Sequence, residues 1–127
     1  MESQIKPTEA ELEILNVVWE NGPSSVRFVN DMLNTKKETG YTTTLKFMQL
    51  MTAKKLLNRN DIGRQHIYEA AVDEVETRTQ LLEKFMNAAF RGSASQLVMQ
   101  ALGNNTTSRS ELNEIKQLIA KLEGGKL

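Results

Sequence analysis

Two groups of apolar residues near the N-terminus recur at the spacing of amphipathic helices. Thr8 and Glu11 have the three-residue spacing of a capping box, which predicts that a first helix begins there. Its apolar face is expected to carry Leu12, Leu15, Val18 and Trp19. Asn21-Gly22-Pro23 ends this helix, and Ser24-Ser25 starts a second one. The second apolar face carries Val26, Val29, Met32 and Leu33.

A third helix is predicted from Thr42 to Leu57, after a polar loop at residues 36–40. Its buried face is expected to carry Thr44, Phe47, Met48 and Met51. The opposite face is small and polar, with Thr42, Lys46, Gln49 and Ala53. Such a face can approach base-pair edges closely in a major groove, but it is also typical of any exposed helix face.

Residues 57–70 predict a two-stranded hairpin with a short basic tip. Ile67 lies between polar residues, as in a half-buried strand, and Gly63 permits a tight turn beside Arg64. Three helices followed by a hairpin are the order of a winged helix-turn-helix. In that fold the second and third helices form the DNA-binding helix-turn-helix, and the hairpin forms the wing.

Beyond residue 73 the pattern becomes purely helical. A helix is predicted from Glu74 to Phe90, followed by a break at Arg91-Gly92-Ser93, a short helix and a linker at residues 103–107. Ser108 and Glu111 form a second capping box and begin a last helix that continues to Leu122, before a frayed end at residues 123–127.

The apolar faces of these last helices are too broad for about fifty residues to bury alone. They must fold back on the winged helix or meet a second copy of the chain. A twofold dimer is favoured, because its symmetry matches that of a palindromic DNA site. The predicted fold class is mainly α, with a winged helix-turn-helix domain at residues 1–72 and a helical dimerisation domain at residues 73–127.

Composition excludes several classes of protein. The chain is 39% apolar, enough for a core, but no apolar run approaches the roughly 18 residues that span a membrane. The N-terminus lacks the apolar segment of a secretory signal, and the chain has no cysteine. These features predict a cytoplasmic protein without disulfides or membrane insertion.

The distribution of charge is more informative than its sum. The formal net charge is zero, yet residues 36–64 contain seven basic and two acidic side chains, which gives +5 there and −5 elsewhere. A local basic field is what phosphate binding requires. Charge alone leaves open a solvated helix face with excess lysine.

Catalysis and cofactor binding lack candidate residues. His66 is the single histidine, so a metal site would need carboxylates almost alone, and a thiol nucleophile is impossible. No glycine-rich phosphate-binding loop occurs. We therefore predict that the chain is not an enzyme and holds no cofactor or metal.

Four stretches of the chain, in order, resemble the BlaI/MecI/CopY family of bacterial transcriptional repressors. They are Thr8–Leu15 with Val18-Trp19-Glu20, Tyr41–Leu45, Lys54–Leu57 with Gly63-Arg64 and Tyr68, and Ser108–Leu122. The resemblance implies a homodimeric repressor that binds double-stranded DNA at a dyad operator.

The resemblance also assigns candidate DNA contacts. Tyr41, Thr42, Thr43 and Lys46 would begin the recognition helix, Ser25 and Arg27 would lie near phosphates, and Arg64 would be the wing residue. Gln49 continues the outer face of the helix, and Lys54 and Arg59 belong to the basic stretch. Family members often have arginine at position 49 or 50 and threonine at position 46, so the operator of this chain is expected to differ.

The tail is expected to carry the dimer contacts and a candidate cleavage site. The dimer contacts are Leu82, Phe85, Met86, Ala89, Leu97, Val98, Leu112, Ile115, Leu118, Ile119 and Leu122. The resemblance implies that members of the family that regulate antibiotic resistance are inactivated by cleavage of an Asn-Phe bond in the tail, for which a membrane sensor-protease is the candidate partner. The matching position here is Gln100-Ala101. Copper sensing through a cysteine-rich tail is excluded.

A second function remains open, since a winged helix can also bind other proteins. The alternative is a protein–protein interaction module without specific DNA binding. The basic stretch and the small polar helix face favour DNA.

Overall fold

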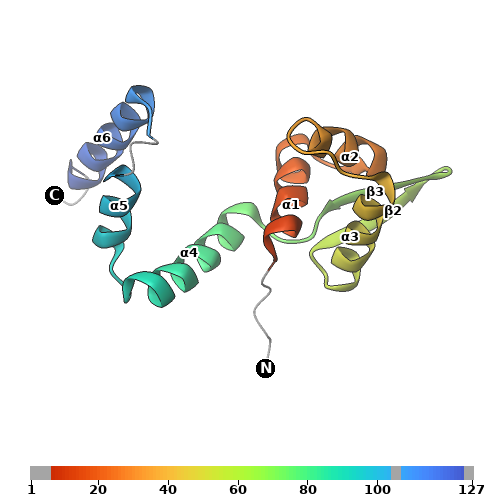
Figure 1. Cartoon of the computed structure of the whole chain (residues 1–127), viewed down its shortest axis with the longest axis horizontal. Helices are drawn as coiled ribbons and strands as arrows, with labels where there is room; N and C mark the ends of the chain where they lie inside the picture. The colour runs from red at the N-terminus through yellow and green to blue at the C-terminus, as the bar shows by residue number, and fades with distance from the viewer. Residues whose placement is uncertain (1–6, 104–106, 125–127) are drawn as a thin grey trace. The chain divides into compact units, whose positions relative to one another are not determined.

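The computed structural model describes residues 7–103 and 107–124 of the chain (Figure 1). The elements are α1 (Glu9–Asn21), β1 (Ser24–Ser25), α2 (Val26–Asn34), α3 (Tyr41–Ala53), β2 (Leu57–Ile62), β3 (Gln65–Ala70), α4 (Glu74–Phe90), α5 (Ala94–Gly103) and α6 (Arg109–Gly124). The chain divides into two compact units, residues 1–81 and 82–127, which we call the winged unit and the tail unit. The predicted mainly helical fold with a winged helix-turn-helix is confirmed.

The first helix begins and ends where the sequence predicts. Thr8 Oγ1 accepts from the backbone N–H of Glu11 at 3.2 Å, and Glu11 Oε1 accepts from the backbone N–H of Thr8 at 2.9 Å. Gly22, with φ 83°, ends the helix in a conformation that favours glycine. The capping box predicted from the sequence is therefore present in the structure, with both of its hydrogen bonds.

The wing contains one strand more than predicted. Ser24–Ser25 forms β1, which pairs antiparallel with β3 through Ser24–Tyr68 and Ser25–Ile67, so the sheet has the order β1-β3-β2. Ser25 also caps α2, because its hydroxyl accepts from the N–H of Phe28 at 3.1 Å. The pair of serines therefore both starts the second helix and ties it to the wing.

The third helix ends at Ala53 rather than at the predicted Leu57. Lys55 adopts a left-handed conformation with φ 69°, and the N–H of Leu56 bonds to the carbonyl of Met51 at 2.8 Å. This turn sends Leu56 and Leu57 into the core, where both are buried. Their apolar character continues the helical pattern in the sequence although the backbone has already turned.

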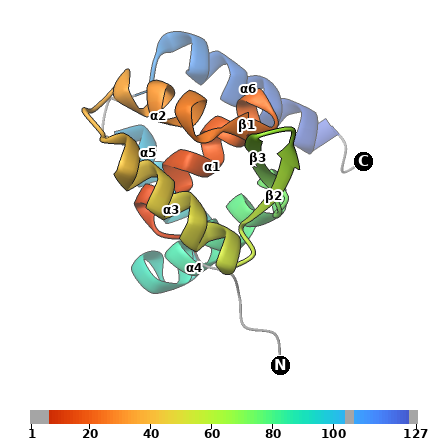
Figure 2. The ribbon, with the colours of Figure 1, turned by 90° about the vertical axis from the view of Figure 1, so that its right-hand side faces the viewer.

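The core of the winged unit joins all three helices to the wing. Its buried apolar members are Ile14, Leu15, Val18, Val26, Val29, Met48, Met51, Leu56, Leu57 and Tyr68. Leu12, Trp19, Leu33 and Phe47 pack against it in partly buried positions. Thr44 is fully buried, as its place on the inner face of α3 predicts. In Figure 2, α3 and the β2–β3 hairpin lie on the side of the unit that faces the viewer.

The first two turns of α4 belong to the winged unit. Thr77 is buried, and the guanidinium of Arg78 lies 5.8 Å from the centre of the Trp19 ring. The indole N–H of Trp19 donates to the carbonyl of Val72 at 3.0 Å. We call these contacts the α1–α4 joint. The predicted domain boundary after residue 72 rests on the change of pattern and remains a prediction.

The tail unit follows the predicted order of elements. Helix α4 has the predicted bounds and ends where Arg91 and Gly92 have φ 53° and 82°. Ser108 and Glu111 form the second predicted capping box, with bonds of 3.0 and 3.1 Å. Part of the predicted linker, residues 104–106, and the end of the predicted frayed tail, residues 125–127, lie outside the described residues. In the described ranges no helix is long and apolar enough to cross a membrane.

Candidate nucleic-acid interface

The outer face of α3 is open to solvent, as the sequence predicts. Tyr41, Thr42, Thr43, Lys46 and Gln49 are all exposed, whereas Thr44, Met48 and Met51 are buried on the opposite face. Leu50 is also 56% exposed, and sequence analysis did not single it out. A helix whose outer face is small, polar and unobstructed has the shape that a major groove accepts.

Arg27 and Tyr41 meet at the start of the helix pair. The guanidinium of Arg27, in α2, lies 5.5 Å from the centre of the Tyr41 ring, in α3. Such a cation–π contact holds both side chains near the N-terminus of α3 without neutralising the charge. Ser25 lies at the start of the same α2, with its hydroxyl engaged in capping.

Lys54 has an intramolecular partner. Its Nζ lies 2.7 Å from Oε2 of Glu11, which is buried in α1. Burial raises the pKa of Glu11, but the hydrogen bonds from Lys54 and Thr8 outweigh burial and leave that pKa below its ordinary value. The Lys54 side chain is still 52% exposed, so the pair joins the two helices at the surface of the unit.

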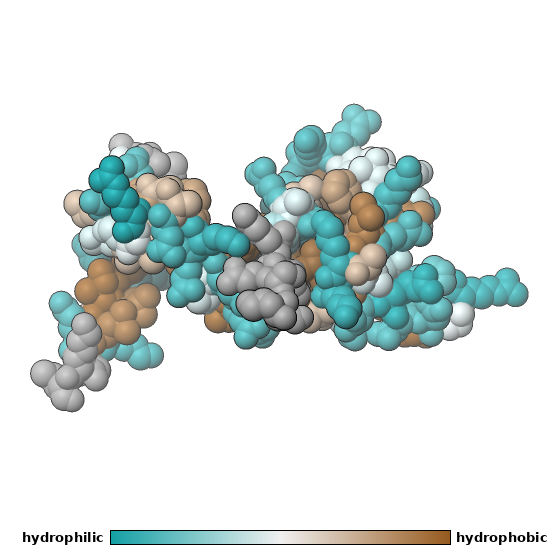
Figure 3. All heavy atoms as spheres, turned by 90° about the horizontal axis from the view of Figure 1, so that it is seen from below, coloured by the Kyte–Doolittle hydropathy of each residue, from teal (hydrophilic) through white to brown (hydrophobic). Residues whose placement is uncertain are grey.

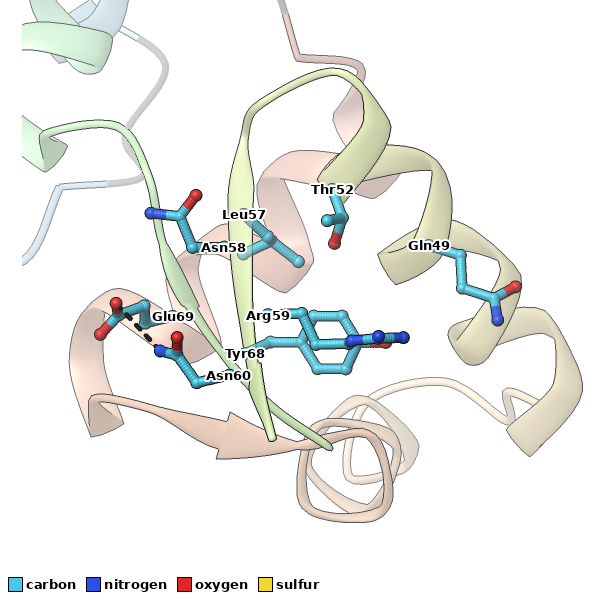
Figure 4. A pocket seen from close by; sticks show the side chains of 8 residues that line it. All are labelled: Gln49, Thr52, Leu57, Asn58, Arg59, Asn60, Tyr68 and Glu69. Carbon is cyan, nitrogen blue, oxygen red and sulfur yellow. Dashed lines mark hydrogen bonds between the residues drawn. The ribbon is translucent and has the colours of Figure 1, made fainter. Parts of the chain in front are cut away.

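A groove of about 740 Å³ separates the recognition helix from the wing (Figure 4). Gln49 lines it from α3 and Arg59 from β2, so the structure brings together two residues that the sequence predicts separately. Arg59 lies opposite Tyr68 in the pairing of β2 with β3, and its Nε lies 3.3 Å from Oδ1 of Asp61. This cation therefore lies between α3 and the wing strands.

Sequence analysis missed four polar residues that line the same groove, of which Glu69 is one and the other three are uncharged. The uncharged residues are Thr52, Asn58 and Asn60. Asn60 donates to Oε2 of Glu69 at 3.2 Å, across the two wing strands. The polar run after Leu57 was the available signal, because every residue of β2 beyond Leu57 is exposed.

The wing tip presents a free cation. Gly63 has φ 63° in the two-residue turn between β2 and β3, and Arg64 beside it is exposed. Behind the tip, Nδ1 of His66 lies 2.7 Å from Oδ1 of Asp61. Among the described residues, neither Arg64 nor Lys46 has a side-chain partner.

The tail unit leaves its apolar side chains exposed. No residue of α5 or α6 is buried, and Phe85, Leu118 and Leu122 are 56%, 55% and 57% exposed. Apolar side chains therefore reach the surface of this unit in Figure 3. Leu82, Ala89, Val98, Leu112 and Ile119 are exposed as well, and Met86, Leu97 and Ile115 are partly buried. Gln100 and Ala101 are exposed on α5.

Comparison with known proteins assigns the family. A sequence profile of the penicillinase repressor family matches residues 7–121. The chain is 29% identical to the penicillinase repressor of Bacillus licheniformis over 113 residues, which cover 88% of each protein. It is 22% identical over 112 residues to an uncharacterised 16.5 kDa protein of Latilactobacillus sakei, with 88% of this chain and 77% of that protein covered.

One solved structure, of the Bordetella bronchiseptica protein BpsR, whose DNA binding is regulated by 6-hydroxynicotinic acid, has a TM-score of 0.47 and 18% identity. That comparison covers 94% of this chain and 76% of the other. The profile match covers nearly the whole chain and includes both units. The family is one of transcriptional repressors and not of enzymes, which confirms the expectation that this chain is not an enzyme. The chain belongs to the penicillinase repressor family and is a DNA-binding transcriptional repressor.

Proposed function

We propose that the chain represses transcription as a homodimer on a twofold-symmetric operator, with α3 of each subunit in a major groove and each wing beside it. The observation that carries this proposal is an open polar face on α3 beside two cations, Lys46 on the helix and Arg64 on the wing, that have no partner among residues 7–103 and 107–124. The outer face of α3, with Lys46, reads base edges, and Arg64 on the wing holds phosphate.

The predicted DNA contacts separate into two groups by their intramolecular partners. Lys54 and Arg59 are engaged by Glu11 and Asp61, and Arg27 lies against Tyr41. Lys46 and Arg64 have no such partner in the described ranges, so contact with DNA breaks no existing ion pair of either residue. We propose that Lys46 uses this freedom to read a base edge and that Arg64 uses it to provide salt-dependent affinity.

The second copy binds through the tail unit in this proposal. Three helices with no buried residue from Leu82 onward cannot be secure alone, because burial of apolar surface is the main stabilising term. Two symmetric copies would cover the face that includes Phe85, Leu118 and Leu122. Twofold symmetry in the protein then matches twofold symmetry in the operator.

A membrane sensor-protease is the proposed source of derepression. The proposed cut is at Gln100-Ala101, and the exposure of both residues on α5 supports it. A cut there separates α6 from the winged unit.

Selection from a pool of random duplexes tests the function. The full chain is expected to enrich a sequence with two inverted half-sites, and sedimentation equilibrium is expected to give a dimer at micromolar concentration. Enrichment of no sequence, together with retention of a protein partner, would favour the protein-interaction module instead.

A further inference from the structure

The recognition helix is the one helix of the winged unit without a side-chain cap of its own, among the residues that the structure describes. Thr8 caps α1, Ser25 caps α2, and Asp73 Oδ2 accepts from the N–H of Glu76 at the start of α4. The N-cap of α3 is Gly40, which has no side chain to provide such a bond. The start of α3 must therefore be positioned by other residues.

Asn34, at the end of α2, holds the loop that leads into α3. Its Nδ2 donates to the carbonyl of Thr39 at 2.9 Å, and its Oδ1 accepts from the N–H of Thr39 at 2.9 Å. The same Nδ2 also donates to the carbonyl of Asn30 at 2.7 Å. One amide thus satisfies both backbone groups of Thr39, one residue before Gly40.

Asn30, one turn earlier in α2, reaches the first turn of α3. With its amide nitrogen toward α3, it donates to Thr44 Oγ1 at 2.7 Å and to the carbonyls of Thr39 and Gly40 at 3.1 and 3.2 Å. The opposite orientation would set its oxygen against two carbonyl oxygens. The Thr44 hydroxyl in turn donates to the carbonyl of Gly40 at 3.3 Å, and Thr44 is fully buried.

We infer that Asn30, Asn34 and Thr44 form a clasp that sets where the recognition helix begins, and that they are positioning residues for operator recognition. The inference rests on the proposed function. The residues next to the clasp, Tyr41 to Thr43, are predicted DNA contacts, but the clasp itself lies behind them. A base-edge hydrogen bond tolerates little displacement, whereas attraction between lysine and phosphate tolerates much more. Loss of the clasp should therefore reduce discrimination between sequences more than it reduces general DNA affinity.

Two variants of Thr44 make a matched pair. Thr44→Val keeps the shape and removes the hydroxyl, and Thr44→Ser keeps the hydroxyl. Each is measured as the full chain on the duplex enriched by the wild type and on a scrambled duplex. Thr44→Val should lower the ratio of the two affinities by about tenfold, the size of one lost base contact, and Thr44→Ser should restore most of it.

Asn34→Ala is the second variant, because Asn34 is exposed and its loss leaves no cavity. It should lower the same ratio while binding to the scrambled duplex and the midpoint of thermal unfolding stay close to the wild type. An unchanged ratio in folded variants, or a parallel fall on both duplexes, would overturn the inference. Unfolding of Asn34→Ala would overturn it too, because Asn34 would then serve stability rather than position. If the wild type itself enriches no duplex, it is the proposed function that fails.

Discussion

Glu11 combines two roles in one buried carboxylate, since it closes the capping box and pairs with Lys54. Glutamine can close a capping box, but it cannot form the ion pair. We expect Glu11→Gln to lower the free energy of unfolding at pH 7 by about 1–2 kcal/mol, a range kept small because Lys54 is half-exposed. Urea denaturation measures it, with the exposed Glu13→Gln as the control.

The same pair predicts a dependence on pH. The pKa of Glu11 in the folded chain lies below its ordinary value of 4.5, so its contribution is complete above that pH and is lost as the pH falls through the folded pKa. The difference between wild type and Glu11→Gln should therefore shrink between pH 5 and pH 3, about the span over which such a group titrates. A constant difference over this range would show that the charge of Glu11 is not what stabilises the fold.

Lys46 and Arg64 have different expected roles although neither has an ion-pair partner in the part of the chain that the structure describes. Lys46 is on the outer face of α3, so Lys46→Ala should change which half-site is preferred in a random-duplex selection. Arg64 is at the wing tip, so Arg64→Ala should weaken all duplexes similarly and reduce the slope of affinity against salt by about one unit. An unchanged preference with Lys46→Ala would make Lys46 a phosphate contact instead.

At the scale of helices and strands, local signals were predicted well and non-local ones were not. The capping boxes at Thr8 and Ser108 and the turn at Gly63 depend on neighbours in sequence, and the structure has all three. Strand β1 is two residues long and exists through its pairing with Tyr68 and Ile67, more than forty positions away in the chain. No local pattern could predict it.

The candidate nucleic-acid interface also contains features that the sequence predicts locally and features that depend on tertiary packing. The outer face of α3 follows from helical periodicity, so its exposed residues could be predicted from the sequence. The groove shared by Gln49 and Arg59, the ion pair of Lys54 and the clasp of Asn30 depend on which elements pack together. These features appear only once α2, α3 and the wing are placed around one core.

The prediction about dimerisation concerns exposed apolar side chains on helices α4 and α6. Placing glutamate at Phe85 and Leu118, each more than half exposed in the single chain, should produce monomers that bind DNA weakly. A buried uncompensated charge is strongly unfavourable in an apolar interface, whereas a charge on the exposed surface of a monomer is not. Sedimentation equilibrium measures the change, and Gln117→Glu on the polar side of α6 is the control. A wild type that is already monomeric at micromolar concentration would contradict the prediction.

At the scale of the whole molecule, repression is expected to depend on an unbroken backbone through the tail unit, which connects α6 to the winged unit. A specific protease site placed at Gln100-Ala101 should, when cut completely, reduce operator affinity by about 10²–10⁴-fold, the gain that tethering two binding modules provides. The uncut protein with the same site is the control. Full affinity after complete cleavage would show that α4 and the remaining part of α5 hold the dimer without α6.

The α1–α4 joint also gives the chain a built-in optical reporter. Trp19 is the single tryptophan, and it has a hydrogen bond to Val72 and the charge of Arg78 over its ring, so we expect its emission to respond to both contacts. We expect Arg78→Gln to shift the emission maximum and Arg109→Gln, in α6, to leave it unchanged. Light from one indole would then report, without any added label, whether the start of α4 stays docked on α1 when the protein binds its operator or loses its tail.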